Sequence, residues 1–199
     1  HLITKHRFMK KVLYVCYVDF EKAFDMVRRE EVLARAHQLG MHGSFLHALE
    51  KWLLNSSLSV CVNGQQGAAF PTYRGTKQGG RLSPLLFGLF VEQLHELLQQ
   101  QVPGAGPMVG NMRVPDILYA DDVKLLTNRP EQVQQLLDVV HLFCVLFDMR
   151  VNVSPHTTCI VVYGQLACAL HVWTLGDKVV PVCDGYTDLG VKCTAARGL

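Results

Sequence analysis

Hydrophobic and polar positions divide the chain into strands and amphipathic helices. Residues 12–18 form a continuous apolar run of β-branched and aromatic side chains that ends at Asp19, which predicts a strand buried on both faces. Apolar residues recur at helical spacing in four later stretches, which are predicted as helices: 28–39, 44–55, 83–100 and 130–147. Gly40 is placed to end the first of these helices, and Ser44 and Ser83 are candidate N-caps.

The remaining apolar runs alternate with polar residues or are short, and they predict strands. Residues 58–62 alternate and lead into Asn63-Gly64, a tight hairpin signal. Further strands are predicted at 112–119, 123–127, 159–163, 171–175 and 178–182, with a loop at 103–110. Without the insertions the order is strand, helix, strand-turn-strand, helix, strand. This order predicts an α+β fold with a split βαβ, ferredoxin-like core, an antiparallel sheet with helices on one face.

Composition narrows the possible classes of protein. With 199 residues, of which 49% are hydrophobic and 18% charged, the chain suits one ordinary globular core. The formal net charge of +2 does not by itself mark a polyanion binder, and the basic run over 5–11 is expected to be a solvated leader. No apolar run approaches the roughly 18 residues of a membrane span, so no membrane partner is expected. The seven scattered cysteines predict reduced thiols and a soluble, intracellular protein.

Three acids stand where predicted strands end or turn. Asp19 closes the first strand, and Asp121 and Asp122 lie at the turn between two later strands. In a βαββαβ sheet the first strand and this hairpin are neighbours, so the three carboxylates are expected to meet. Clustered carboxylates raise one another's pKa unless a cation is present, and oxygen ligands favour magnesium or manganese. Asp19 and Asp121 are the predicted principal ligands and Asp122 a secondary one; the alternative is that all three are solvated turn residues.

Three sequence blocks resemble a known family. They are the segment 17–25, which contains Lys22-Ala23-Phe24-Asp25; the segment 74–87, which contains a Gln-Gly loop and Leu-Ser-Pro-Leu-Leu-Phe; and Tyr119-Ala120-Asp121-Asp122. In this order they resemble the reverse transcriptase of non-LTR, LINE-like retrotransposons. The resemblance covers residues 12–191 and implies a polymerase palm with part of the fingers.

The resemblance implies a reaction and its metal ions. It implies transfer of deoxynucleotides to a primer 3' end on an RNA or DNA template. Two Mg²⁺ or Mn²⁺ ions would be held by Asp19, Asp121 and Asp122, and the backbone carbonyl of Phe20 would complete one coordination sphere. Such a pair of ions activates the attacking hydroxyl and stabilises the leaving oxygen.

The resemblance also implies contacts to the dNTP and the primer. Phe24 would stack under the incoming sugar and exclude a 2'-hydroxyl by its bulk. Gln78 and Gly79 would line the nucleotide pocket, the glycine allowing close backbone approach. Tyr119 would pack against the primer end. Judged from sequence alone, Phe24 would be a core residue and Tyr119 a buried tyrosine with a satisfied hydroxyl.

Departures from the family pattern leave a second hypothesis open. Arg81 replaces the usual proline before Leu-Ser-Pro, and the segment 152–158 lacks the lysine that the family places there to protonate pyrophosphate. His156 is not expected to replace that lysine, because Pro155 stiffens the loop and the register is shifted. The alternative is a truncated, catalytically inactive retroelement remnant that keeps only the fold. A metal-dependent phosphohydrolase is disfavoured, since no D-x-D nucleophile is present.

The expected domain organisation follows from the resemblance. Residues 1–164 are predicted as the palm with partial fingers, and residues 165–199 as a β-rich extension that leads toward a thumb. Within this extension the segment 186–191 resembles the family's hairpin before the thumb, with Asp188 in place of the usual aromatic residue. The start at His1 and the missing thumb suggest part of a longer product or a truncated gene. The sequence does not indicate an oligomeric state.

Overall fold

The chain divides into two compact units in the computed structural model, which describes residues 2–9, 11–77, 79–164 and 171–195. The first unit comprises His1–Glu21 and Gln93–Leu199, and the second comprises Lys22–Glu92. The long helix α5 (Ser83–Gln101) supplies residues to both. The division predicted at residue 164 adjoins a stretch outside the described residues and stays a prediction.

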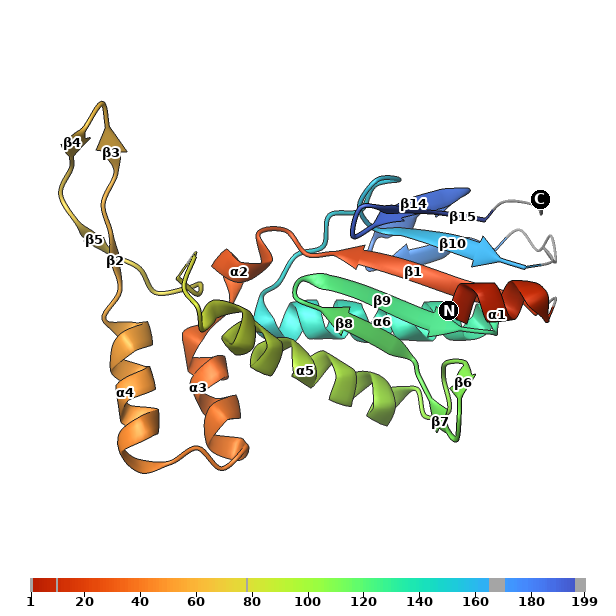
Figure 1. Cartoon of the computed structure of the whole chain (residues 1–199), viewed down its shortest axis with the longest axis horizontal. Coiled ribbons are helices and arrows are strands. Elements are labelled where there is room, and N and C mark those ends of the chain that lie inside the picture. The colour runs from red at the N-terminus through yellow and green to blue at the C-terminus, as the bar shows by residue number, and fades with distance from the viewer. Residues whose placement is uncertain (1, 10, 78, 165–170, 196–199) are drawn as a thin grey trace. The chain divides into compact units, whose positions relative to one another are not determined.

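A five-stranded sheet forms the centre of the first unit (Figure 1). Its order is β13-β10-β1-β9-β8, antiparallel throughout except for the parallel pair of β10 and β13. The strand bounds are β1 Leu13–Asp19, β8 Asp116–Tyr119, β9 Asp122–Thr127, β10 Cys159–Tyr163 and β13 Val182–Cys183. The order β10-β1-β9-β8 is that of a βαββαβ core, so the predicted fold class is confirmed. Because β1 is central, its side chains are buried on both faces from Leu13 to Val18.

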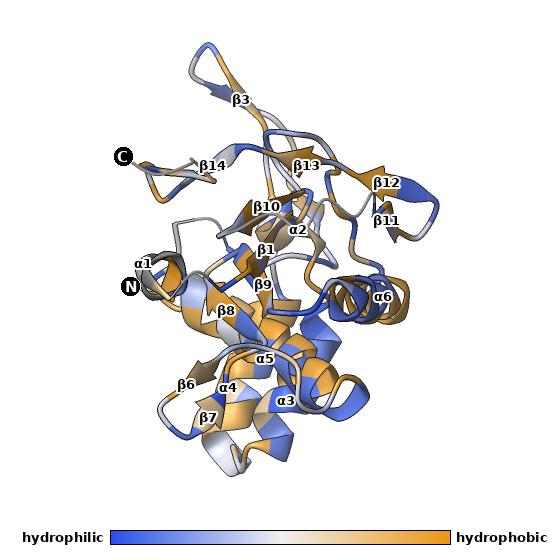
Figure 2. Cartoon of the chain, turned by 90° about the vertical axis from the view of Figure 1, so that its right-hand side faces the viewer, coloured by the Kyte–Doolittle hydropathy of each residue, from blue (hydrophilic) through white to orange (hydrophobic). Residues whose placement is uncertain are grey.

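Different elements cover the two faces of this sheet. Helix α6 (Pro130–Phe147) packs on β1 and β9, and it carries one hydrophobic and one hydrophilic side (Figure 2). On the other face, a core cluster around Val15 and Tyr17 is covered by helix α1 (Leu2–Phe8) and by a C-terminal hairpin. Within the basic run expected to be a solvated leader, Lys11 is exposed as expected, but His6 is buried, and Leu2 and Ile3 of α1 pack against the cluster. The other elements of this unit are β6 Met108–Val109, β7 Met112–Arg113, β11 Trp173–Leu175, β12 Lys178–Val180, β14 Gly185–Asp188 and β15 Val191–Thr194.

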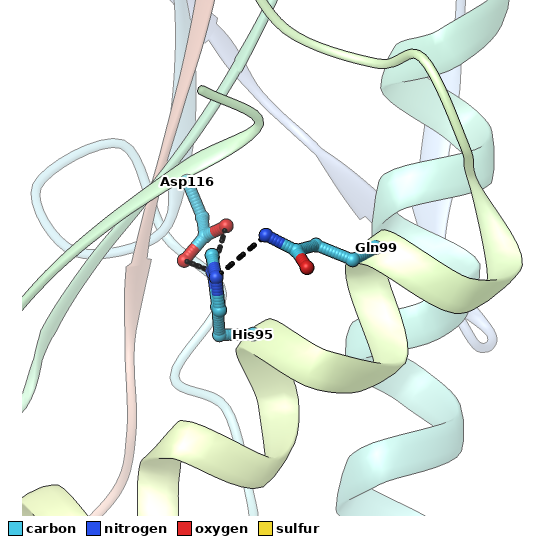
Figure 3. A network of polar contacts seen from close by, with 3 residues as sticks. All are labelled: His95, Gln99 and Asp116. Atoms are coloured by element: carbon cyan, nitrogen blue, oxygen red, sulfur yellow. Dashed lines mark hydrogen bonds and ion pairs between the residues drawn. The ribbon is translucent and has the colours of Figure 1, made fainter. Parts of the chain in front are cut away.

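A polar network joins α5 to the outer strand β8 within the first unit (Figure 3). The buried carboxylate of Asp116 lies 2.8 Å from Nδ1 of His95, and Nε2 of His95 lies 2.8 Å from the amide nitrogen of Gln99. Burial raises the pKa of the Asp116 carboxyl, and the hydrogen bond from His95 opposes that shift. The imidazole thus provides the buried acid with a partner, which fixes the position of α5 against β8.

The second unit is mostly helical. Its elements are α2 Ala23–Met26, α3 Arg29–Gln38, α4 Gly43–Leu54, β2 Ser57–Leu58, β3 Cys61–Val62, β4 Gln65–Gln66 and β5 Phe70–Pro71, followed by the first part of α5. Gly40 has a φ of +89° just after α3, as expected of a terminating glycine. Two expected caps are wrong: α4 is capped at His42 rather than Ser44, and the Ser83 hydroxyl donates to the carbonyl of Lys77.

The predicted strand over 58–62 is interrupted in the structure. Two short strands, β2 and β3, replace it, and they pair with β5 and β4. The tight turn is confirmed, since Asn63 and Gly64 have φ angles of +50° and +80°. The apolar side chains of Leu58, Val60 and Val62 are exposed, so their alternation does not mark a buried face. None of the described helices combines the length and hydropathy needed to cross a membrane.

Candidate active site

Asp19 and Asp122 are brought together by the register of β1 and β9. The two strands pair antiparallel over six positions, from Tyr14 opposite Thr127 to Asp19 opposite Asp122. Residues that face each other across antiparallel strands project from the same face, with Cβ atoms about 4.5–5.5 Å apart. The prediction that the first strand and the later hairpin meet at one edge of the sheet is therefore confirmed by the pairing of β1 with β9.

Asp121 reaches the same edge from the turn between β8 and β9. Tyr119 pairs with Asp122, so the connection consists of Ala120 and Asp121, with a left-handed φ of +52° at Ala120. Only Asp121 lies in the turn; the prediction that both acids lie there is wrong for Asp122, which begins β9. This difference removes a geometric conflict, because neighbouring side chains on one strand would point to opposite faces.

The electrostatic environment shows that the three carboxylates interact. The pKa of Asp19 is raised, first by burial and then by the charges of Asp121, Asp122 and Glu21, while a hydrogen bond from Asn152 opposes the shift. The pKa of Asp122 is raised by burial and by Asp121. Carboxylates that raise one another's pKa form an uncompensated negative site, which is where a divalent cation binds most favourably.

The three carboxylates have the oxygen atoms that a hard divalent cation prefers, but they do not form a complete set of metal ligands. Three carboxylates at one sheet edge supply the oxygen ligands that magnesium and manganese prefer. Across the described ranges, however, no group of three or more His, Cys, Asp or Glu side chains is arranged to hold a metal ion. The backbone thus gathers the acids at one sheet edge.

Polar residues from the loop after α6 hold Asp19 in place. The Asp19 amide donates to the hydroxyl of Thr158 at 2.9 Å, and the Asp19 carbonyl accepts from the Asn152 amide at 2.9 Å. The Asn152 side-chain nitrogen lies 3.5 Å from a carboxylate oxygen of Asp19. Sequence reasoning missed both partners, although Asn152 stands in the segment that departs from the family pattern. His156, in the same loop, is exposed and lines a groove of about 570 Å³ with Tyr186 and Lys192.

The hairpin β14–β15 docks beside the acids through a stacked ring and an ion pair. The ring of Tyr186 stacks on Tyr17 with centroids 4.0 Å apart. Nζ of Lys124 lies 2.8 Å from a carboxylate oxygen of Asp188. Lys124 also lowers the pKa of Asp122, against the larger effects that raise it. Asp188, which stands where the family has an aromatic residue, therefore pairs with Lys124, two residues after Asp122. The sequence alone did not reveal this contact.

Two further predicted residues lie beside the acids. The Phe20 ring is buried and packs on Phe143 at 6.0 Å, so only its backbone carbonyl is a candidate metal ligand. Tyr119 is 61% exposed at the end of β8, which rules out the interpretation of a buried tyrosine. Its ring is therefore accessible to a ligand at the acidic edge.

Of the predicted nucleotide-binding residues, Phe20 belongs to the first unit, and Phe24 and Gly79 belong to the second. Phe24 is half-buried on α2, with its ring 4.7 Å from that of Phe87. The Phe24 carbonyl accepts a hydrogen bond of 2.9 Å from the amide of Thr76, which ties α2 to the loop before α5. Gly79, in this loop, has a φ of +75°, and a Cβ added there would meet no atom within 4 Å, so its backbone is open to approach. Gln78 lies outside the described residues.

Comparison with known proteins identifies the family. The family model described as "Reverse transcriptase (RNA-dependent DNA polymerase)" matches residues 3–171. The chain belongs to this reverse transcriptase family. A Pol polyprotein of the type-1 retrotransposable element R2 from Popillia japonica is 30% identical over 151 residues, which cover 75% of this chain and 21% of that protein. The type-2 element R2DM from Drosophila melanogaster is 27% identical over 195 residues, covering 92% of this chain and 18% of that protein.

These relatives are R2 retrotransposon proteins, which confirms the resemblance to the non-LTR type of reverse transcriptase. The chain spans about a fifth of the length of these relatives. Among solved structures, telomerase from Candida albicans in complex with a fragment of telomeric RNA matches with a TM-score of 0.60 at 14% identity, covering 84% of this chain and 30% of that one. Apo telomerase from Candida tropicalis matches with a TM-score of 0.50 at 13% identity, covering 70% and 29%. Their likeness supports the reverse transcriptase fold.

Proposed function

We propose that the chain is the catalytic palm of an RNA-directed DNA polymerase that adds deoxynucleotides to a primer 3' end on an RNA or DNA template. One observation carries the proposal: in a chain of the reverse transcriptase family, strand register sets Asp19 opposite Asp122, with Asp121 in the adjoining turn. The R2 relatives are Pol polyproteins, which supports the same reaction. The comparisons do not support the inactive remnant better than the active enzyme.

In this proposal the three aspartates hold two Mg²⁺ or Mn²⁺ ions, with the carbonyl of Phe20 as a further oxygen ligand. Bound ions of this kind increase the acidity of the primer hydroxyl and stabilise charge on the departing pyrophosphate. The paired strands β1 and β9 hold the backbones of Asp19 and Asp122 opposite each other, so only the side chains would need to reorient to bind cations.

The other predicted residues contact the substrates. Phe24 limits the space beside the sugar of the incoming dNTP, Gln78 bonds to the dNTP or its template base, and Gly79 allows close backbone approach. Tyr119, exposed beside the acids, packs against the primer terminus. The intracellular location expected from the cysteine usage is part of the same proposal.

Metal binding tests the proposal on the chain itself. Manganese titration followed by calorimetry and by paramagnetic NMR broadening should show binding that broadens resonances near Asp19 and Asp122. Asp121→Asn should weaken this binding, because it removes one of the clustered negative charges. Asp138→Asn on α6 is the matched control and should bind as the wild type does.

Primer extension tests the reaction. The chain would be placed between intact fingers and thumb of a related reverse transcriptase and supplied with primer, template and dNTPs. The proposal would be supported if this chimera extends the primer and the Asp121→Asn variant of it does not. A folded chimera that neither extends primers nor binds manganese would instead favour the inactive remnant.

A further inference from the structure

A single buried arginine holds the loop that precedes α5. Arg29 is the first residue of α3 and is 4% exposed. Its guanidinium donates four hydrogen bonds: Nε to the Gly75 carbonyl at 2.8 Å, Nη2 to the Arg74 carbonyl at 2.8 Å and to the Thr72 hydroxyl at 3.0 Å, and Nη1 to the Thr72 carbonyl. The acceptors all lie within four consecutive residues of one loop.

The same loop is tied to α2 and to the residue that follows this helix. The Gly75 amide donates to the Val27 carbonyl at 2.8 Å, and the Thr76 amide donates to the Phe24 carbonyl at 2.9 Å. At Gly75, a Cβ atom would lie 2.9 Å from the Asp25 carbonyl oxygen, so the two backbones are in direct contact. Arg29 and these backbone bonds therefore fix residues 72–76 immediately before Lys77, Gln78 and Gly79.

The chemistry of the contact explains why an arginine suits it. A planar guanidinium presents several donors in a fixed fork and binds three carbonyls at once, whereas an ammonium is a compact point charge. The charge lies at the N-terminus of α3, where the helix dipole disfavours a cation. Helix stability does not account for a buried cation there, whereas loop attachment does.

We propose that Arg29 is a positioning residue for nucleotide binding: it holds the 72–76 loop against α2, so that Gly79 keeps a fixed distance from Phe24. The proposal rests on the proposed function, since it assigns Phe24 and Gly79 to the dNTP. Arg29 itself touches no substrate in this account. Its loss would loosen the loop and weaken dNTP binding, and it would leave primer–template binding unchanged.

Hydrogen–deuterium exchange on the chain tests the loop attachment without any need for polymerase activity. Arg29→Lys keeps the charge and loses the fork, and it should speed exchange in peptides covering 72–80 about tenfold. Peptides from α3 and α4 should exchange as in the wild type. Arg28→Lys is the matched control: Arg28 is the neighbouring residue, lies 3.7 Å from Glu31, and should leave the loop unchanged.

Two exchange results would overturn the proposal. Unchanged loop exchange in Arg29→Lys would show that the four hydrogen bonds do not hold the loop. A uniform increase across 22–92 would show that Arg29 merely stabilises the whole unit. Arg29→Ala serves as the stronger variant, and Arg29→Lys decides the question if the alanine variant does not fold.

A kinetic measurement in the chimera then separates positioning from general damage. Arg29→Lys should raise the KM for dNTP about tenfold, with kcat changed less than about threefold and the KM for primer–template unchanged. Parallel changes in all three constants would overturn the positioning role. If the wild-type chimera extends no primer, the proposed function fails, and the exchange experiment still decides whether Arg29 holds the loop.

Discussion

The acidic edge of the sheet and the loop at 72–79 are held in place by different kinds of interaction. At the edge, strand register sets Asp19 opposite Asp122, and the carboxylates there repel one another. In the loop, one buried cation and a few backbone hydrogen bonds hold the chain. The edge thus carries an unbalanced charge on paired strands, whereas the position of the loop depends on a small number of polar contacts.

This difference predicts how each region responds to substitutions. Changes at the acidic edge should alter charge and metal binding while the sheet persists, because many buried residues support β1. Changes in the loop should alter geometry, because a few hydrogen bonds and one close backbone contact fix it. Four experiments test the contrast.

The largest effect is expected at Gly75. Gly75→Ala forces a Cβ to within 2.9 Å of the Asp25 carbonyl at a φ of +81°, which should lower the free energy of unfolding by about 3 kcal/mol. Gly79→Ala is the matched control: its φ is +75°, no atom lies within 4 Å, and a loss of about 1 kcal/mol is expected. Urea denaturation of both variants measures the difference. Equal losses would show that the close backbone contact does not matter.

At the acidic edge, the Thr158 hydroxyl accepts the backbone amide of Asp19 in a buried position. Thr158→Val keeps the shape and leaves this amide without its acceptor, which should cost about 1.5 kcal/mol of unfolding free energy. Thr158→Ser keeps the hydroxyl and should cost less. Thermal melts of the two variants provide the comparison, and a valine variant as stable as the serine variant would contradict the role assigned to this bond.

The ion pair of Lys124 and Asp188 should contribute about 1 kcal/mol, because both side chains are largely buried and 2.8 Å apart. Lys124→Met, Asp188→Asn and the double variant form a cycle whose coupling energy measures the pair. Lys192→Met, an exposed lysine on β15, controls for loss of positive charge. Strictly additive effects would mean that the hairpin docks through the Tyr17–Tyr186 stack alone.

The smallest effect concerns the pH dependence of Asp19. Because its pKa is raised in the folded protein, the folded state binds the proton more tightly than the unfolded state does. Protonation therefore stabilises the fold below the unfolded pKa of about 4, and that gain is lost as pH rises through the folded pKa.

Asp19→Asn should accordingly stabilise the protein by about 0.5 kcal/mol at pH 7 without divalent ions, after allowance for solvent screening. The gain should vanish near pH 3. Melting temperature against pH measures it, with Glu30→Gln, an exposed change on α3, as control. A stabilisation that persists unchanged at pH 3 would exclude a charge effect. Added manganese should reverse the order by stabilising only the wild type.

The sequence predicted the acidic edge better than the loop, for a physical reason. Buried strands and the hairpin at Asp121 leave a local signature in hydrophobic alternation, and the βαββαβ order makes the strands neighbours. The predicted strand over 159–163 agrees with β10 at both ends. Contacts such as Arg29 with Thr72, or Lys124 with Asp188, join polar residues far apart in the chain and leave no periodic signal. The alternation of apolar and polar residues also wrongly predicted one continuous strand at Leu58 and Val60, whose side chains are exposed.

The central position of β1 has a consequence for how the chain folds. This strand is made before its partners, residues 122–127 and 159–163, which lie more than a hundred positions later. Contacts of such long sequence separation make folding slow, and an apolar strand that waits for its neighbours is prone to aggregate. Nascent chains should therefore need chaperone protection until β10 has emerged, and truncations before residue 159 should be insoluble.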